Sequence, residues 1–360
     1  CALISYIRLL NNQNKFYDLT DVKKDLAETS SSRRSGGYWG ENPVNNQEAA
    51  PTISEITVAG DNFEPKESYE FSAQSGSLGL TVKINGAVFE EYLKSTLTFS
   101  TDTITYSLPA GSIDFDEILS ALNETDKSKV SVKIELLSLN DEESKNVKAT
   151  AEDKKVKILL NPVKVSILAV SGYKTFNVDK LKKPALIKIK LTSQSDSGGC
   201  ISAVKKDLSP VISTVSFDNS HLLIKTLVNS NFTAISTSKS FLDTDHHWAK
   251  KEIEGLANRL IINGSDENNF EPDNYITRAE FAAIITKAIG ITPVFSQRFS
   301  DLQLTDWFGG YAAAAADFGL IEGKSQNIFA PYDYITREET AVILERAAAL
   351  LGIGNEVDEG

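Results

Sequence analysis

The main change in the spacing of hydrophobic residues along the chain comes at about residue 240. Between Thr52 and that point, short runs alternate apolar and polar side chains, as in Leu78, Leu80, Val82 and Ile84, and turn residues separate the runs. Alternation of this kind is typical of strands with one buried face. The pattern predicts antiparallel β-sandwich-like modules, the first at residues 51–150 and the second at residues 151–240.

One segment of the first module departs from alternation. Phe115, Ile118, Leu119 and Leu122 stand at helical spacing after an acidic first turn. Acidic residues favour the positive end of a helix, so this segment is predicted to form one short helix that covers part of a sheet. Residues 1–50 become rich in Ser, Gly and Arg and are expected to be a linker or a partial N-terminal segment, and residues 354–360 a truncated tail.

Beyond residue 240 the chain repeats itself after about 59 positions. The repeated residues of the first copy are Phe241, Asp243, Trp248, Gly264, Phe270, Pro272 and Ile276-Thr277-Arg278-Ala279-Glu280. Those of the second copy are Phe299, Asp301, Trp307, Gly323, Phe329, Pro331 and Ile335-Thr336-Arg337-Glu338-Glu339. A repeat of this length indicates one supersecondary unit that stacks on its neighbour.

Each copy contains a helix start that can be read from the sequence. Thr277 with Glu280, and Thr336 with Glu339, have the spacing of a capping box, in which two side chains bind the free N–H groups of the first turn. An apolar stripe precedes each box, so residues 241–298 and 299–353 are each predicted to be a helix, a loop and a helix. The chain as a whole is therefore expected to be α+β and multidomain, with a helical bundle after the β modules.

The copies differ at two positions of note. Thr340 stands where the first copy has Phe281, so the second capped helix lacks an apolar staple and should fray more easily. Leu260 stands where the second copy has Gly319.

Composition narrows the possible functions. The formal net charge is -12 and the sequence pI is about 4.9, and no basic tract is interleaved with aromatic residues, which argues against a nucleic-acid surface. Two cysteines without metal-ligand spacing make a disulfide framework or a zinc site improbable. No apolar run reaches the ~18 residues that a transmembrane helix needs. The chain begins with Cys1 and contains no Met, so we expect its start to be a processing or fragment boundary.

Signals for catalysis are weak. Glu64, Glu67, Glu90 and Glu91 could be combined into a carboxylate pair, but acidic loop residues of an acidic protein are usually solvated. The adjacent His246 and His247 lack a third ligand at useful spacing. We therefore expect no enzyme activity, no metal site and no cofactor.

The repeated motif resembles the S-layer homology module. The residues that carry the resemblance are Phe-x-Asp, Trp-Ala, the Ile-x-Gly turn, Phe-x-Pro and Ile-Thr-Arg, over about 110 residues. The resemblance implies a pseudo-threefold bundle of three modules, with grooves that bind pyruvylated secondary cell-wall polysaccharide. It also implies that Arg278 and Arg337 contact the acidic sugar, that Trp248 and Trp307 line the groove, and that Asp243 and Asp301 order the entrance loop.

Each of these residues also has a purely structural interpretation. The arginines could form internal pairs, the tryptophans could be core residues, and the aspartates could cap the first helix of each repeat, with Asp245 as another possible cap. Both interpretations stay open at the level of sequence.

The function implied by the resemblance is non-covalent anchoring of a secreted protein to the cell wall or S-layer of a bacterium. One alternative is the anchor tail of an extracellular glycan-degrading enzyme whose catalytic domain lies upstream. Another is an adhesin whose β region binds carbohydrate or protein. Because two copies are present where three usually pack together, another chain with the same module is a possible partner.

Overall fold

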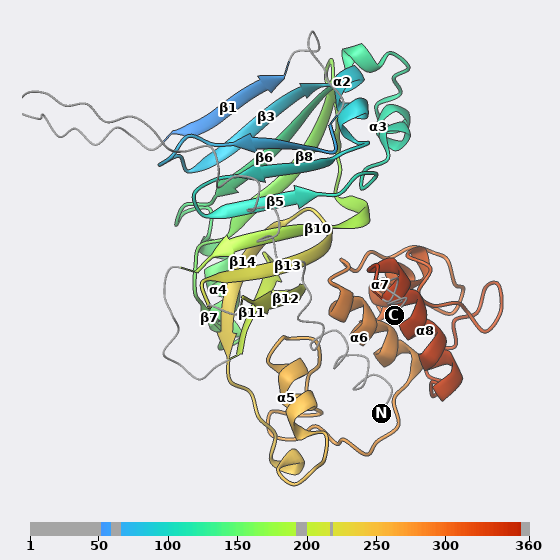
Figure 1. Cartoon of the computed structure of the whole chain (residues 1–360). Helices are drawn as coiled ribbons and strands as arrows, with labels where there is room; N and C mark the ends of the chain where they lie inside the picture. Colours follow the sequence, from blue (N-terminus) through green and yellow to red (C-terminus); the bar gives the residue numbers. More distant parts are fainter. Residues whose placement is uncertain (1–51, 59–65, 192–199, 217–218, 354–360) are drawn as a thin grey trace, which may run out of the picture.

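The computed structural model describes residues 52–58, 66–191, 200–216 and 219–353 (Figure 1). The expected N-terminal linker at residues 1–50 and the expected tail at residues 354–360 lie outside the described residues. The remainder contains two open sheets and a group of helices, so the fold is mixed α+β, as the sequence predicted.

We call the described residues from β1 to β14, which end at Thr237, the β body. Its first sheet has the strand order β1-β3-β6-β8-β14-β11, with β7 paired to β14 and β9 paired to β8. The strands of this sheet are β1 (Ile53–Val58), β3 (Gly79–Asn85), β6 (Ser131–Ser138), β7 (Lys157–Ile158), β8 (Val163–Ser171), β9 (Lys174–Asn177), β11 (Cys200–Lys205) and β14 (Asn231–Thr237).

The second sheet has the order β12-β13-β10-β5-β4-β2. Its strands are β2 (Ser68–Ser72), β4 (Thr96–Ser100), β5 (Ile104–Leu108), β10 (Lys180–Lys190), β12 (Ile212–Val215) and β13 (His221–Val228). The pairs β1–β3 and β2–β4 are parallel, and the other ladders between described strands are antiparallel. The antiparallel prediction therefore holds for most of the β body but not for the edges formed by β1 and β2.

Both sheets contribute to one hydrophobic core. Val82 and Ile134 face it from the first sheet, and Leu97, Tyr106 and Ile187 face it from the second. A core shared in this way is what a sandwich-like packing of two sheets requires. Strands from residues 51–150 pair with strands from residues 151–240 in both sheets, as β6 does with β8 and β5 with β10. The two predicted modules thus share their sheets and their core.

Three helices and a short 3-10 turn accompany the β body: α2 (Gly86–Tyr92), α3 (Phe115–Leu122), α4 (Lys145–Asp153) and η3 (Lys127–Lys129). The helix α3 confirms the one predicted from helical spacing. Asp114 caps it by accepting hydrogen bonds from the N–H groups of Asp116 and Glu117, and Phe115, Ile118 and Leu122 are its buried face. A polar cap and an apolar stripe are both local features, which is why the sequence sufficed to locate this helix.

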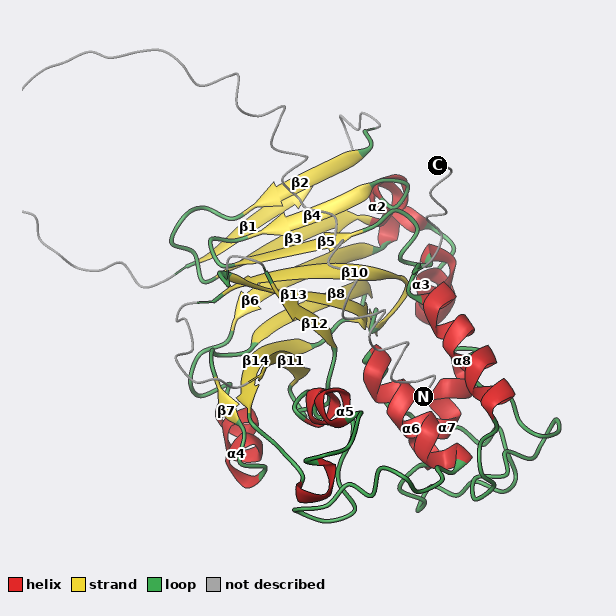
Figure 2. Ribbon diagram, turned by 60° about the horizontal axis from the view of Figure 1, so that its bottom comes forward, coloured by secondary structure: helices red, strands yellow, loops and turns green. Residues whose placement is uncertain are grey.

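The repeats supply the remaining helices: η4 (Leu242–Thr244), α5 (Lys250–Ala257), α6 (Arg278–Ile289), α7 (Gly309–Asp317) and α8 (Arg337–Leu350). Each repeat is a helix, a loop and a helix, as predicted. Figure 2 shows α6, α7 and α8 gathered together, with α5 to one side beneath the β strands. Side chains of α6, α7 and α8 share one core, whereas α5 packs in a smaller cluster that includes Ala288 of α6.

The β body contacts the helices through a few specific side chains. Leu227 of β13 belongs to the core of α6, α7 and α8. Lys205, which is 2% exposed, donates hydrogen bonds to the Gly290 carbonyl (3.2 Å) and the Thr292 hydroxyl (2.9 Å) just after α6. Burial lowers the pKa of Lys205 to about 8, against a smaller opposing effect of the Asp207 charge. The repeats are therefore attached to the β body by buried groups.

Candidate functional site at the joint between the repeats

The capped helices of both repeats begin as the sequence predicted. Thr277 and Glu280 at the start of α6, and Thr336 and Glu339 at the start of α8, form complete capping boxes. Thr340, which replaces the staple residue of the first repeat, donates its hydroxyl to the Thr336 carbonyl at 2.9 Å. The greater fraying expected of α8 stays a prediction.

The two helix starts lie against each other. The N–H of Arg278 donates to the carbonyl of Asp333 at 2.8 Å, and the N–H of Ile335 donates to the carbonyl of Ile276 at 3.1 Å. Thr277 and Tyr334 form an isolated antiparallel bridge between these contacts. We call this crossing of the two Ile-Thr-Arg segments the joint.

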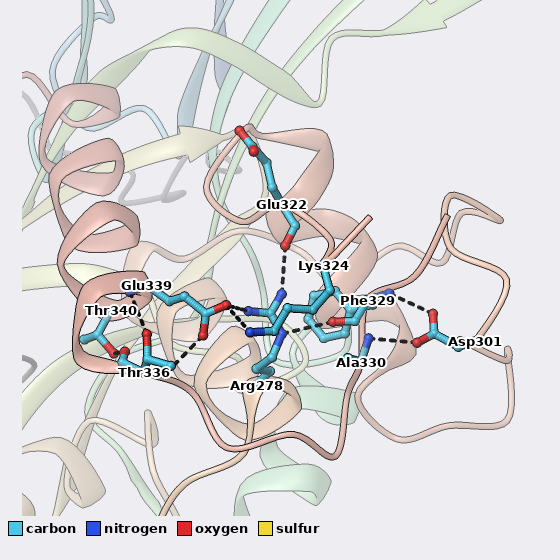
Figure 3. Close-up of polar contacts among 9 residues, drawn as sticks. All are labelled: Arg278, Asp301, Glu322, Lys324, Phe329, Ala330, Thr336, Glu339 and Thr340. Carbon is cyan, nitrogen blue, oxygen red and sulfur yellow. Dashed lines mark hydrogen bonds and ion pairs between the residues drawn. The ribbon is translucent and has the colours of Figure 1, made fainter. Parts of the chain in front are cut away.

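Arg278 connects the two repeats through its side chain (Figure 3). It is 2% exposed, and it is among the largest fully buried side chains. Its Nε donates to the Phe329 carbonyl at 2.9 Å, one terminal nitrogen to Glu339 at 2.5 Å, and the other to the Glu322 carbonyl at 2.8 Å. A planar guanidinium with several N–H donors is suited to such a divergent set of acceptors. This geometry agrees with the interpretation that Arg278 forms an internal, structural pair.

Glu339 is shared between two functions at the joint. It accepts the Thr336 N–H of its own capping box at 3.0 Å, and Lys324 places its ammonium 2.8 Å from the same carboxylate. Burial raises the pKa of Glu339, but hydrogen bonds from Lys324 and Thr336 and the charge of Arg278 outweigh it, so the net pKa lies below the ordinary value. The carboxylate is therefore held in its charged form between two cations.

Arg337, at the equivalent position of the second repeat, is placed differently. Its side chain is exposed, and it forms no hydrogen bond or ion pair with another residue in the described part of the chain. In the first repeat the acceptors that correspond to those around Arg278 are Glu280 and the carbonyls of Phe270 and Asn263. No guanidinium of a described residue donates a hydrogen bond to these three acceptors.

The entrance loops are organised by the two aspartates. The Asp243 carboxylate accepts the N–H groups of Phe270 (3.0 Å) and Glu271 (2.6 Å), and Asp301 accepts those of Phe329 (2.9 Å) and Ala330 (2.7 Å). Asp243 does not cap α5, because that helix has Ala249 at its N-cap without any side-chain cap bond. The same finding makes the suggestion of Asp245 as the cap wrong.

A glycine lets each loop close tightly. A Cβ added to Gly264 would lie 2.3 Å from the Asn269 carbonyl oxygen, and one added to Gly323 would lie 2.4 Å from that of Ile328. Any side chain would collide with the backbone, which explains why both copies have Gly in this turn.

Both tryptophans point outward. Trp248 is 61% exposed and Trp307 is 62% exposed, so the interpretation of these residues as core is wrong. Trp248 lines a wide, open groove of about 990 Å³, together with Lys239, Lys250, Lys251 and His246. Lys250 is paired with Asp245 at 2.6 Å, and Lys251 is exposed at the same groove. This groove places a largely exposed indole beside ammonium groups.

Comparison with known sequences identifies the repeats. The profile of the S-layer homology domain matches residues 240–282 and 298–341, which are the two ranges that contain the joint, the entrance loops and the tryptophans. The chain carries two S-layer homology domains.

Several relatives contain the same kind of domain within much longer chains. An amylopullulanase of Thermoanaerobacterium thermosulfurigenes is 32% identical over 202 residues, which is 54% of this chain and 10% of the relative. The exoglucanase XynX of Acetivibrio thermocellus is 40% identical over 118 residues, 32% of this chain and 11% of the relative. The surface-layer 125 kDa protein of Lysinibacillus sphaericus is 35% identical over 108 residues, 30% of this chain and 9% of the relative.

The chain thus spans about a tenth of the length of these relatives. With surface-layer and cell wall proteins among them, the chain is a cell-surface protein with S-layer homology domains. No helix in the described ranges is both long and apolar enough to cross a membrane.

The S-layer homology domains also contain residues that the reading of the sequence overlooked. Tyr275 and Tyr334 hold equivalent positions, directly before Ile-Thr-Arg in each domain, and their rings meet at the joint with centroids 5.4 Å apart. Lys324, whose ammonium forms an ion pair with Glu339, was also overlooked. The recurrence of Tyr-Ile-Thr-Arg in both copies was a signal for the tyrosines, whereas nothing in the motif marks Lys324.

Two of the four carboxylates considered for catalysis, Glu90 and Glu91, are engaged in ion pairs, and no ion pair among the described residues involves Glu67. Glu90 lies 2.6 Å from Lys127, and Glu91 lies 2.7 Å from Lys94. Glu64 lies outside the described residues. Within those residues, no group of three or more His, Cys, Asp or Glu side chains is arranged to hold a metal ion.

Proposed function

We propose that this chain anchors a secreted protein to the bacterial cell wall, and that its two S-layer homology domains do so by binding secondary cell-wall polysaccharide without a covalent bond. The observation that carries the proposal is the occurrence of both domains with their motif residues in regular geometry and with Trp248, Trp307 and Arg337 on the outside. Binding of this kind needs no chemical step, and we propose no enzyme activity for the chain itself.

The six motif residues then divide by task. Trp248 and Trp307 offer exposed indole faces to sugar rings, and the Arg337 guanidinium can form a bidentate pair with a carboxylate such as that of a pyruvyl ketal. Asp243 and Asp301 hold the entrance loops through backbone N–H groups. Arg278 holds the two domains in register, and its buried guanidinium supports the ligand surface rather than forming it.

Co-sedimentation with purified wall sacculi tests the anchoring. The chain should pellet with intact sacculi and stay in solution after the polysaccharide, or its pyruvyl groups, are removed. Equal binding to treated and untreated sacculi would refute the mechanism. Trp248→Ala and Trp307→Ala should each weaken binding, and Tyr173→Ala provides a control because Tyr173 is 93% exposed on the β8–β9 turn, outside the S-layer homology domains.

Arg337 requires a separate test, because its equivalent in the first domain, Arg278, forms internal contacts at the joint. If Arg337 contacts the polysaccharide, Arg337→Ala should lose affinity for sacculi while its sedimentation velocity matches that of the wild type. If Arg337 instead inserts into the acceptors around Glu280 of another S-layer homology domain, the variant should change its state of association. A clean monomer at all concentrations for both proteins would remove the proposal of a partner chain.

A second candidate is the anchor region of a larger extracellular enzyme that degrades glycans. The match to the amylopullulanase covers 54% of this chain, which is more than the two S-layer homology domains occupy, so part of the β body is shared with that enzyme. A longer reading of the gene decides between the candidates, since a catalytic domain next to the β body would favour the enzyme. An adhesin would instead show binding of carbohydrate or protein by the β body alone.

A further inference from the structure

The tyrosine pair at the joint is largely exposed to solvent. Tyr275 is 84% exposed and Tyr334 is 64% exposed, although their ring centroids are 5.4 Å apart. The ring planes are tilted by 41°, so the rings are not stacked face to face, and most of each side chain is accessible to solvent. Residues whose purpose is packing would be buried, and this pair is not.

The backbone beneath the pair is held firmly. The bridge between Thr277 and Tyr334 and the bond from the Arg278 N–H to the Asp333 carbonyl fix the two segments side by side. The buried side chain of Arg278 adds bonds to the Phe329 carbonyl and the Glu339 carboxylate, on either side of Tyr334 in the chain. A surface held in this way loses little conformational freedom when a ligand binds, which favours affinity.

The exposed sequence neighbours of the pair include polar and acidic side chains beside one further aromatic residue, Tyr332. Asp273, Asn274 and Asp333 are all exposed and lie within two residues of a tyrosine. The core of a protein interface is enriched in tyrosine but depleted of charged groups, so it is the carboxylates beside the pair that argue against a protein partner. Sugar hydroxyls donate well to carboxylates, whereas an anionic substituent would be repelled by them. The chemistry therefore favours an uncharged sugar ring with hydroxyls at its edge.

We propose that Tyr275 and Tyr334 form a stacking platform for an uncharged pyranose unit of the wall polysaccharide. The apolar face of the ring lies on the tyrosines, and the ring hydroxyls reach the acidic side chains beside them. The proposal rests on the proposed anchoring function and adds a subsite to it: the platform takes a neutral sugar, and the carboxylate of the ligand is taken elsewhere.

Calorimetric titration of the full chain with soluble polysaccharide released from the wall tests the platform. We expect Tyr275→Ala with Tyr334→Ala to weaken binding by about tenfold, which corresponds to about 1.4 kcal/mol. Tyr275→Phe with Tyr334→Phe should bind within about twofold of the wild type, because stacking needs the ring and not the hydroxyl. Tyr173→Ala should bind as the wild type does. Thermal unfolding followed by tryptophan fluorescence shows whether each variant is folded.

The outcomes separate the two proposals. A wild-type chain that does not bind the polysaccharide overturns both the anchoring function and the platform. A wild-type chain that binds, with a folded double alanine variant of equal affinity, overturns the platform alone. A double variant that loses self-association in sedimentation, with unchanged sugar affinity, also overturns it in favour of a contact between copies. Should the double variant unfold, Tyr275→Ala alone, at the more exposed position, must still lose affinity.

Discussion

Replacing Arg278 with alanine should destabilise the pair of S-layer homology domains by about 3 to 4 kcal/mol, and the same change at Arg337 should cost less than about 0.5 kcal/mol. The two residues hold the same position in the repeated motif, so each is a control for the other. They differ in environment: Arg278 is 2% exposed with three acceptors, and Arg337 is exposed.

The magnitude follows from what the substitution leaves behind. Removing one partner of a buried ion pair costs about 3–5 kcal/mol when the other charge is stranded. In the Arg278→Ala variant Glu339 would keep some stabilisation, because its side chain is 25% exposed and Lys324 remains 2.8 Å away. The loss of the ion pair should therefore cost no more than the lower end of that range, about 3 kcal/mol. The carbonyls of Phe329 and Glu322 each lose a donor, at about 1 kcal/mol apiece.

Urea denaturation followed by far-UV circular dichroism measures this difference. The longest helices of the described residues, α6 and α8, belong to the repeats, so the helical signal reports mainly on these domains. Arg278→Lys should recover only part of the loss, because an ammonium cannot reach three divergent acceptors. A double-mutant cycle with Glu339→Gln should show coupling of at least about 1 kcal/mol. An Arg278→Ala variant within about 1 kcal/mol of the wild type, or an Arg337→Ala variant equally destabilised, would refute the role of the joint.

Further predictions concern the turn, the β body and its attachment to the helices. Gly264→Ala should destabilise the first domain by more than about 2 kcal/mol in the same urea titration, because the new methyl group collides with the Asn269 carbonyl. Gly255→Ala in α5 is the control, and it should be neutral or stabilising by up to about 1 kcal/mol. Tyr106→Phe should cost about 1–2 kcal/mol in a melt followed by far-UV circular dichroism, since the buried Asn229 oxygen, 2.8 Å from the Tyr106 hydroxyl, loses its donor; no loss would contradict the buried hydrogen bond. Lys205 has a folded pKa of about 8, lowered by burial from 10.5, so its charged form is disfavoured in the fold. Burying the charged ammonium therefore costs its full share of the folding free energy below about pH 8, and this cost falls as the pH rises toward 10.5, because the unfolded chain keeps the proton up to that pKa. Relative to Lys205→Met, the free energy of unfolding of the wild type should rise by on the order of 2 kcal/mol between about pH 7 and pH 10. Parallel pH profiles of the two proteins would argue against burial of the ammonium.

The departure at Leu260 is explained by packing across domains. Leu260 has a φ of 59° and Gly319 at the equivalent position has a φ of 69°, so both occupy the left-handed region that favours glycine. Leu260 packs against a cluster of the β body that includes Val204 and Ile235. Burial of the leucine side chain offsets the backbone cost of about 1–2 kcal/mol. The second domain has no such neighbour in that cluster and uses glycine.

Much of the local structure was determined by the sequence alone. The capping boxes at Thr277 and Thr336 and the cap of α3 at Asp114 form between residues two or three positions apart, so neighbouring letters contain all the information. The repeat, the helix-loop-helix units and the change from β to α structure near residue 240 follow from periodicity for the same reason.

Only the tertiary structure decided how equivalent residues differ. Arg278 and Arg337 share the sequence Ile-Thr-Arg, yet one is buried against Glu339 and the other is exposed, because the second domain lies over the first and no described residue lies over the second in the same way. The sharing of both sheets by residues 51–150 and 151–240 is likewise a matter of pairing between distant strands. Burial and strand pairing depend on which surfaces meet in space, and a motif specifies the residues of a surface without specifying what covers it.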